Sequence, residues 1–331
     1  MKLALVTGAT GCVGSHVAER LIAEGYRVRT VVRSSSDTRP IDQWGVEKIE
    51  GDLTDAAALR RAAEGVDLIV HCAAKVGDWG PVDEYRRANV EGTRVLLETA
   101  AGQKLDRFVH VSSLGVYEAR DHFGTDESTP PATQHIDGYT QSKMESEKLV
   151  LEYHRTRGVP VVVIRPGLIY GPRDRVVVPR LVEKIGSGQF RYFGSSDKAM
   201  NSIYVGNLVD VIMLAIQNPA GIGQVYNVTD DDPTSKRRFF GTAARLAGLP
   251  EPTRGIPLAL ARFLAPISAL IAKLRGGKKP PLINPARIKF LGLNLDYSCA
   301  KAKRELGYKP RTSFDEGMKA TIDWFRAEHL I

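Results

Sequence analysis

The sequence predicts an α/β protein with a doubly wound parallel sheet and a smaller C-terminal part. Short apolar, β-branched runs alternate with stretches of helical periodicity, and a glycine-rich turn joins the first run to the first helical stretch. After about residue 172 the pattern becomes irregular. We therefore expect residues 1–171 to form the main domain and residues 172–331 mainly the smaller part, with a segment at about 202–229 returning to the main sheet.

The expected elements follow one another in a regular order. The strands are expected at 3–6, 27–32, 68–72, 108–112 and 161–164, and the helices at 13–24, 55–63, 83–101 and 139–156. In such a sheet, ligands bind beyond the carboxyl ends of the strands. Residues that directly follow a strand are therefore the first candidates for chemistry.

Composition narrows the class of protein. The 331 residues are 43% hydrophobic, and the net charge of +8 is scattered among acidic residues, which argues against nucleic acid as a partner. The odd, widely spaced cysteines Cys12, Cys72 and Cys299 show no metal-like or disulfide-like pairing. A strand is expected within three residues of Met1, which leaves no room for a signal peptide. We expect a cytoplasmic protein without a bound metal.

The stretch VTGATGCVG places Gly8, Gly11 and Gly14 at the first strand-to-helix junction. There the unpaired N–H groups and the positive end of the helix dipole attract a phosphate, and residues without side chains let it approach. The alternative is that the glycines serve only a tight turn. Together with the alternating elements, the loop predicts a Rossmann-type dinucleotide site.

The second strand ends in VVRSSSD, and this end is expected to distinguish the two nicotinamide cofactors. A carboxylate here would favour NAD, whereas Arg33, with Ser34 beside it, suits the extra phosphate of NADP. Asp37 comes too late in the sequence to be that carboxylate. In GDLTD, Asp52 is placed either to contact adenine or to cap the following helix.

The catalytic candidates lie in SSLGVY and YTQSK. Tyr139 and Lys143 are four residues apart in a helical pattern and so share a face. Shifting a phenol from its ordinary pKa to near neutrality takes roughly 4 kcal/mol, which the ammonium and an oxidised nicotinamide would supply together. Such a phenol exchanges a proton with a carbonyl oxygen, to which Ser113 at a strand end would add its hydroxyl.

These motifs, with HCAAKVGDWG, NVEGT, RPGLIYGP and ELGYKPRTSFDEGMKATIDW, make the chain similar to the extended short-chain dehydrogenase/reductase superfamily over nearly its whole length. The resemblance implies Tyr139 as acid/base, Lys143 as its partner and ribose ligand, and Ser113 as the residue that orients the carbonyl. It favours Ser113 over Ser112. The cofactor contacts predicted by the motifs and the resemblance are Gly8, Thr10, Gly11, Cys12, Val13, Gly14, Arg33, Ser34, Asp52, Leu53, Ala73, Ala74, Lys75, Asn89, Tyr139, Lys143, Pro166, Gly167 and Ile169.

Two substrate classes compete within this superfamily. Nucleotide-sugar epimerases and dehydratases usually carry an arginine where this chain has Met200 and an aspartate where it has Asn207. Both departures argue against a sugar nucleotide. The motifs YVGN and AAKVGDWG and the apolar segment after Ile256 instead resemble the 3β-hydroxysteroid dehydrogenase group, which includes sterol dehydrogenases and 2-alkyl-3-oxoalkanoate reductases. The expected function is thus NADP(H)-dependent interconversion of a secondary alcohol and a hydrophobic ketone, with Trp79, Ser113 and Tyr204 as tentative substrate contacts. Arg173, Arg180 or Arg191 remain as another route to a phosphate clamp.

Other functions of the chain remain as alternatives. A redox-sensing regulator on this fold would typically have lost the tyrosine or the lysine, so their retention favours an enzyme. The apolar segment 256–274 is interrupted by Arg262 and Pro266, which argues against a spanning helix. It is expected to cover the substrate mouth, with weak membrane-surface contact through 256–279 as the alternative. Homodimerisation is common in the superfamily.

Overall fold

The computed structural model describes residues 1–274, 280, 281 and 283–331. Its centre is a seven-stranded parallel sheet of strand order β11-β7-β5-β4-β1-β2-β3, which confirms the predicted fold class. The strands are β1 Leu3–Thr7, β2 Arg27–Val32, β3 Glu47–Glu50, β4 Leu68–His71, β5 Arg107–Val111, β7 Val161–Pro166 and β11 Val225–Val228.

Helices cover both faces of this sheet, as the continuous apolar strands require. On one face, α1 Cys12–Ala23 and α8 Val205–Gln217 bury their apolar sides against the strands, with α2 Arg39–Asp42 at the margin. On the other face lie α3 Ala56–Ala63, α5 Gly92–Ala101 and α6 Gly138–Arg157. The two layers leave the carboxyl ends of the strands as the open edge.

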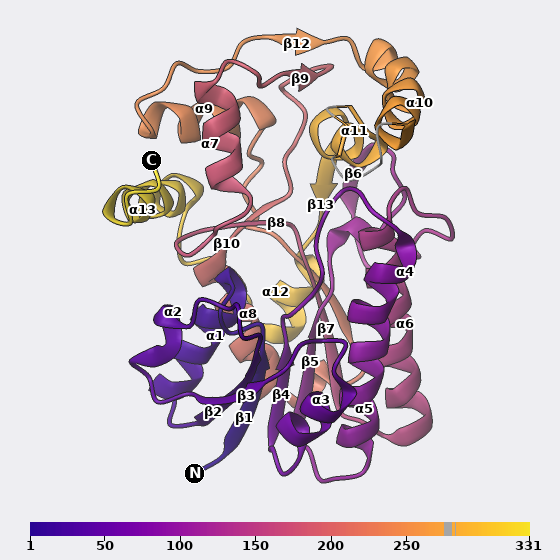
Figure 1. Cartoon of the computed structure of the whole chain (residues 1–331), viewed down its shortest axis with the longest axis vertical. Helices are drawn as coiled ribbons and strands as arrows, with labels where there is room; N and C mark the ends of the chain where they lie inside the picture. The colour runs from indigo at the N-terminus through magenta and orange to yellow at the C-terminus, as the bar shows by residue number, and fades with distance from the viewer. Residues whose placement is uncertain (275–279, 282) are drawn as a thin grey trace.

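The smaller part lies over that edge (Figure 1). It contains short strands, which are β8 Leu168–Tyr170, β9 Tyr192–Phe193, β10 Ser202–Tyr204 and β12 Gly255–Ile256, and the helices α7 Val178–Gly186, α9 Lys236–Leu246, α10 Leu258–Leu274, α11 Pro285–Gly292 and α13 Phe314–Ala327. β6 His122–Thr125 pairs with β13 Leu295–Tyr297 beside it. An aromatic cluster containing Tyr170, Phe239, Phe240 and Phe314 forms its core.

The chain returns from the smaller part to the main sheet. β11 pairs with β7, and α8 packs on the face that α1 covers, whereas β10 pairs with β8 in a separate two-stranded sheet. α12 Ala300–Leu306 also packs here, through Ala302 and Leu306. Elements from the chain after residue 171 thus complete the main domain, and the boundary at 171 remains a prediction.

The helix expected at 83–101 is divided. The structure has α4 Val82–Tyr85, a π-helical segment η1 Arg86–Glu91 and then α5. Segments of π-helix widen the backbone and frequently lie at functional sites. This one carries Asn89.

Candidate active site

The glycine loop is shaped by two close approaches. Gly8 has φ +73°, and a Cβ there would lie 3.0 Å from the backbone of Ala73. A Cβ on Gly14 would lie 2.1 Å from the carbonyl oxygen of Gly8, so this glycine lets α1 start directly against the loop. Gly11 precedes α1, and in the described part of the chain no side chain caps that helix. The loop therefore offers helix N–H groups to an anion, as predicted.

A cavity of about 270 Å³ joins this loop to the predicted catalytic residues. Its walls include Gly8, Gly11, Cys12, Val13, Gly14, Cys72, Ala74, Val76, Val111, Ser112, Ser113, Tyr139, Lys143, Pro166, Gly167, Ile169, Asp174 and Val177. The strand ends, the first turn of α1 and one face of α6 thus meet around one space. Cys72, Val76, Val111, Asp174 and Val177 were not predicted. Val76 lies within the motif HCAAKVGDWG, whereas Asp174 and Val177 come from the turn before α7, which carries no motif.

Ser113 and Tyr139 meet at this cavity. Both residues line its wall, and the Ser113 hydroxyl lies close enough to the Tyr139 phenol to influence its pKa, while it accepts a hydrogen bond from Gly115 N at 2.9 Å. Burial raises the pKa of Tyr139 to about 12, although Ser113 lowers it, and Asp137 raises it further. In the chain alone the pKa of the phenol thus moves away from neutrality, opposite to the direction expected from Lys143. The phenol is a proton donor at neutral pH.

Lys143 lies one turn further along α6 and is buried. Its ammonium donates to the carbonyl oxygen of Val111 at 2.7 Å. Burial lowers the pKa of Lys143 to about 8, while the nearby Cys72 and Glu147 raise it. The bond to Val111 fixes the ammonium at the end of β5, next to Ser113. Lys143 therefore lies on the cavity wall, and its role beside Tyr139 and the cofactor ribose remains a prediction.

Asn89 ties the cofactor-lining loop to α6. Its amide oxygen accepts from Lys75 N at 2.7 Å, and its amide nitrogen donates to Lys75 O at 3.0 Å and to Ser142 Oγ at 2.9 Å. These bonds hold the segment Ala73–Lys75 beside Gly8. Asn89 thus positions the backbone of this loop, and the hydrogen bonds of its side-chain amide are made within the protein.

The carboxyl end of β2 is positively charged. Arg33 and Ser34 are exposed there. The pKa of the neighbouring Asp52 is lowered mainly by hydrogen bonds from the hydroxyl and the N–H of Thr54, and to a smaller extent by the charge of Arg33. Asp52 therefore stabilises its own turn, while Asp55 caps α3. Asp37 is paired with Arg39 at 2.7 Å and with Arg175 at 2.6 Å.

A buried polar network beneath the cavity was missed by the sequence analysis. Glu147 and Arg165 form an ion pair, and both are almost fully buried. Ser112 donates to Glu147 at 2.7 Å, and Arg165 donates to the Tyr117 hydroxyl at 2.7 Å. Ser112 and Ser113 both line the cavity, but the Ser112 hydroxyl is engaged with Glu147. The signal in the sequence was Glu147 itself, four residues after Lys143 on the same helical face.

Of the tentative substrate contacts, Ser113 lines this cavity, whereas Trp79 and Tyr204 lie outside its walls. Trp79 lies in the loop before α4, where its carbonyl accepts from Tyr85, and the preceding Asp78 pairs with Arg287 of α11 at 2.7 Å. Tyr204 packs beside Tyr170 in the aromatic core of the smaller part. Both remain predictions as substrate contacts.

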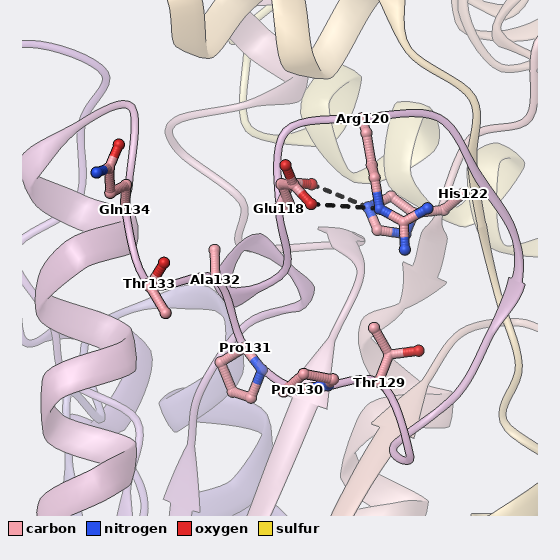
Figure 2. A pocket seen from close by; sticks show the side chains of 9 residues that line it. All are labelled: Glu118, Arg120, His122, Thr129, Pro130, Pro131, Ala132, Thr133 and Gln134. Atoms are coloured by element: carbon pink, nitrogen blue, oxygen red, sulfur yellow. Dashed lines mark hydrogen bonds and ion pairs between the residues drawn. The ribbon is translucent and has the colours of Figure 1, made fainter.

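A second hollow, of about 400 Å³, lies on the loop after Tyr117 (Figure 2). Its walls are Glu118, Arg120, His122, Thr129, Pro130, Pro131, Ala132, Thr133 and Gln134. Arg120 pairs with Glu118 at 3.5 Å, and the His122 ring bonds Thr125 and the Glu118 carbonyl. The polar groups of Glu118, Arg120 and His122 are thus paired or hydrogen-bonded within this loop. The hollow contains none of the predicted catalytic residues, so the chemistry is assigned to the first cavity.

The first cavity fits a nicotinamide dinucleotide. The uncapped start of α1 would hold the diphosphate through the Gly11–Gly14 backbone, and the far wall presents Ser113, Tyr139 and Lys143. Fold and site together define a dinucleotide-dependent oxidoreductase of the α/β class.

Comparison with known proteins gives the same class of protein. Residues 4–229 match the NAD dependent epimerase/dehydratase family, and the chain belongs to that family, as an NAD(P)-dependent oxidoreductase of the extended short-chain dehydrogenase/reductase type. The predicted resemblance is confirmed. The relatives include a 2-alkyl-3-oxoalkanoate reductase from Shewanella oneidensis, 29% identical over 96% of this chain and 84% of that protein.

Two further relatives extend the comparison. A sterol-4-alpha-carboxylate 3-dehydrogenase, decarboxylating, from Candida albicans is 30% identical over 99% of both chains. The crystal structure of a protein titled gox2253 superposes with a TM-score of 0.83 at 29% identity and covers all of both chains. In the described part of this chain, no helix is long and apolar enough to cross a membrane.

Proposed function

We propose that this enzyme reduces a hydrophobic ketone with NADPH, the substrate being a 3-oxo acyl compound or a ring ketone of sterol type. The observation that carries the proposal is that Ser113 and Tyr139 both line the cavity that begins at the glycine loop, with Ser113 close enough to lower the pKa of the phenol. A carbonyl oxygen between two hydroxyl groups is oriented and polarised.

The chain's own residues supply the proton. When bound, the nicotinamide cofactor supplies the hydride that reduces the carbonyl carbon. Tyr139, whose raised pKa keeps it protonated near neutral pH, gives its phenolic proton to the carbonyl oxygen and is reprotonated from solvent. Ser113 holds that oxygen by its hydroxyl. Lys143 would hold the cofactor ribose and place a positive charge near the phenolate that forms.

The proposed substrate class rests on the cationic contacts that the diphosphate of a sugar nucleotide would not find in this chain. Met200, where an epimerase carries its diphosphate-binding arginine, is buried in the aromatic core, and Asn207 is engaged with Asp230 and the backbone of Arg311 and Thr312. Charge-assisted hydrogen bonds contribute about 1.5–3 kcal/mol each, and a diphosphate without a cationic partner would not form several of these bonds.

The other arginines considered for a phosphate clamp are mostly engaged. Arg173 pairs with Glu19 at 2.7 Å and lies over the Trp44 ring, on the cofactor side of the molecule. Arg191 donates to the carbonyls of Gly188 and Phe190. Arg180 on α7 is exposed. The names of the relatives, a 3-oxoalkanoate reductase and a sterol dehydrogenase, support the same lipidic class.

The cofactor preference is argued from charge at the end of β2. The exposed Arg33 guanidinium suits a dianionic phosphate, whereas Asp37 is already paired with two arginines and Asp52 with Thr54. A free carboxylate for the ribose hydroxyls of NAD is thus lacking among the described residues of this turn. We propose NADP(H) over NAD(H).

The alternative function is that of a nucleotide-sugar epimerase or dehydratase, since the family that matches this chain is named for those activities. Calorimetry with UDP- and dTDP-sugars should be run beside an NADPH oxidation assay with 3-oxo acids and steroid ketones of rising size. We expect turnover that improves with apolar size, because each buried methylene contributes about 0.8 kcal/mol. Micromolar binding of a sugar nucleotide without turnover of any lipid ketone would establish the alternative.

A further inference from the structure

Helix α10 exposes six large apolar side chains and buries two alanines. Ala261 and Ala265 are buried against Phe193 and Ile288. The side chains exposed to solvent are Leu260, Phe263, Ile267, Leu270, Ile271 and Leu274, with Phe263 68% and Leu274 79% exposed. At 100° per residue these six fall within one stripe of about 100°. A contiguous exposed apolar face of this kind marks an interaction surface.

The same region carries an unusual charge. Residues 252–295 contain eight basic residues and no acidic one, whereas the whole chain has a net charge of +8. The remainder of the chain is therefore neutral overall. Within the stretch, Arg287 pairs with Asp78, and Lys289 donates to the backbone carbonyls of Gly115 and Tyr117. Arg254 and Arg262, at the start of the stretch, are exposed.

We propose that α10 docks this enzyme on the surface of an anionic lipid bilayer, with the apolar stripe in the acyl boundary and the exposed Arg254 and Arg262 toward the headgroups. An apolar stripe beside excess cations is the combination that binds such a surface. A second copy of this chain would instead bring an equal positive stretch against it, which like-charge repulsion opposes. Residues 275–279 of the expected contact segment 256–279 lie outside the described residues.

The surface is connected to the active site. α10 packs against α11, and Lys289 of α11 bonds the carbonyls of Gly115 and Tyr117, directly after Ser113. Figure 1 shows α10 and α11 side by side above the carboxyl ends of the strands. Docking through α10 would therefore bring a lipid phase near the substrate side of the cavity. The docking proposal itself requires no turnover and does not rest on the proposed ketone substrate.

The test is sedimentation of the full-length protein with vesicles. We expect binding to phosphatidylcholine vesicles containing about 30% phosphatidylglycerol to exceed binding to pure phosphatidylcholine at least about tenfold at low salt, and to weaken as salt rises. Phe263→Ser with Leu270→Ser should reduce binding about tenfold or more. The matched control is Leu330→Ser, an exposed leucine next to the C-terminus, and it should leave binding unchanged; Figure 1 marks the C-terminus on the side of the molecule opposite α10.

Further variants and measurements distinguish the remaining outcomes of the vesicle experiment. Arg254→Gln with Arg262→Gln should lower the preference for phosphatidylglycerol while leaving the apolar stripe intact, and melting curves check that each variant is folded. Absence of wild-type binding to the anionic vesicles overturns the proposal. So does equal binding by the Phe263 and Leu270 double variant and the Leu330 control. A dimer in size-exclusion chromatography that this double variant dissociates, without vesicle binding, assigns the stripe to a second copy instead.

Discussion

Lys143 combines a buried position with a charge that the proposed function requires. Because burial lowers its pKa to about 8, the free protein loses this ammonium as the pH rises through that value. An anionic cofactor favours the ammonium, so binding should raise the pKa of Lys143, and affinity should be greatest below pH 8.

We therefore expect the Kd of NADPH to increase about tenfold between pH 7 and pH 9.5. Fluorescence titration measures this directly. The control is Lys143→Met, which should bind more weakly and show a nearly flat profile over the same range. A profile as steep in Lys143→Met as in the natural protein would assign the pH dependence to another group.

We attribute the proposed preference for NADP(H) to Arg33. We expect NADPH to bind tenfold to a thousandfold more tightly than NADH, about 1.4 to 4 kcal/mol, because a charge-assisted fork on an exposed phosphate is partly solvated. Arg33→Asp should reverse the preference in titrations with both cofactors. Arg27→Asp is the matched control at the amino end of the same strand. Equal affinities of the natural protein for the two cofactors would remove Arg33 from the phosphate site.

Single residues were predictable where one element or one junction sets their place. Tyr139 and Lys143 share a helical face and Ser113 follows a strand, so spacing together with the family resemblance predicted one site for them. The pKa of Tyr139 was not predictable, because it depends on burial by the folded chain. Nor was the pairing of Glu147 with Arg165, which are 18 residues apart and meet only when α6 packs on β7.

At the scale of elements, the buried pair of Glu147 and Arg165 fixes α6 to β7 below the site. Glu147→Gln would leave the Arg165 charge buried without its counterion, and we expect the free energy of unfolding to fall by about 3–5 kcal/mol. Urea denaturation measures the loss. Glu145→Gln on the same helix removes a solvent-exposed partner of Arg86 and should cost under about 1 kcal/mol. Similar losses for the two variants would contradict the role given to the buried pair.

Regular elements with strong periodicity were predicted to within a few residues, such as α6 and β2. The division of 83–101 into α4, η1 and α5 was not, since the sequence pattern stays helical throughout and the widened turn accompanies the bonds of Asn89 to Lys75. α12 was also missed. Its seven residues are too few to show a period, and tertiary packing on the main sheet decides its place.

At the scale of the whole molecule, the main sheet is completed by residues from both halves of the chain. A fragment of residues 1–171 would lack β11 at the sheet edge and α8, whose Val211 and Ile212 cover the strands beside α1. We expect this fragment to lose fixed tertiary packing while keeping secondary structure. Near-ultraviolet circular dichroism and urea unfolding would show it. A native-like spectrum with a cooperative transition would instead make residues 1–171 an independent domain.

The central claim is that Tyr139 donates the proton during hydride-dependent reduction of a ketone. The most direct test is the kcat of Tyr139→Phe in an NADPH oxidation assay with a saturating ketone that the natural enzyme turns over, together with the Kd of NADPH. Removing a general acid costs about a hundredfold or more, so we predict a loss of at least that size in kcat with little change in Kd. Near-normal turnover by Tyr139→Phe would contradict the mechanism.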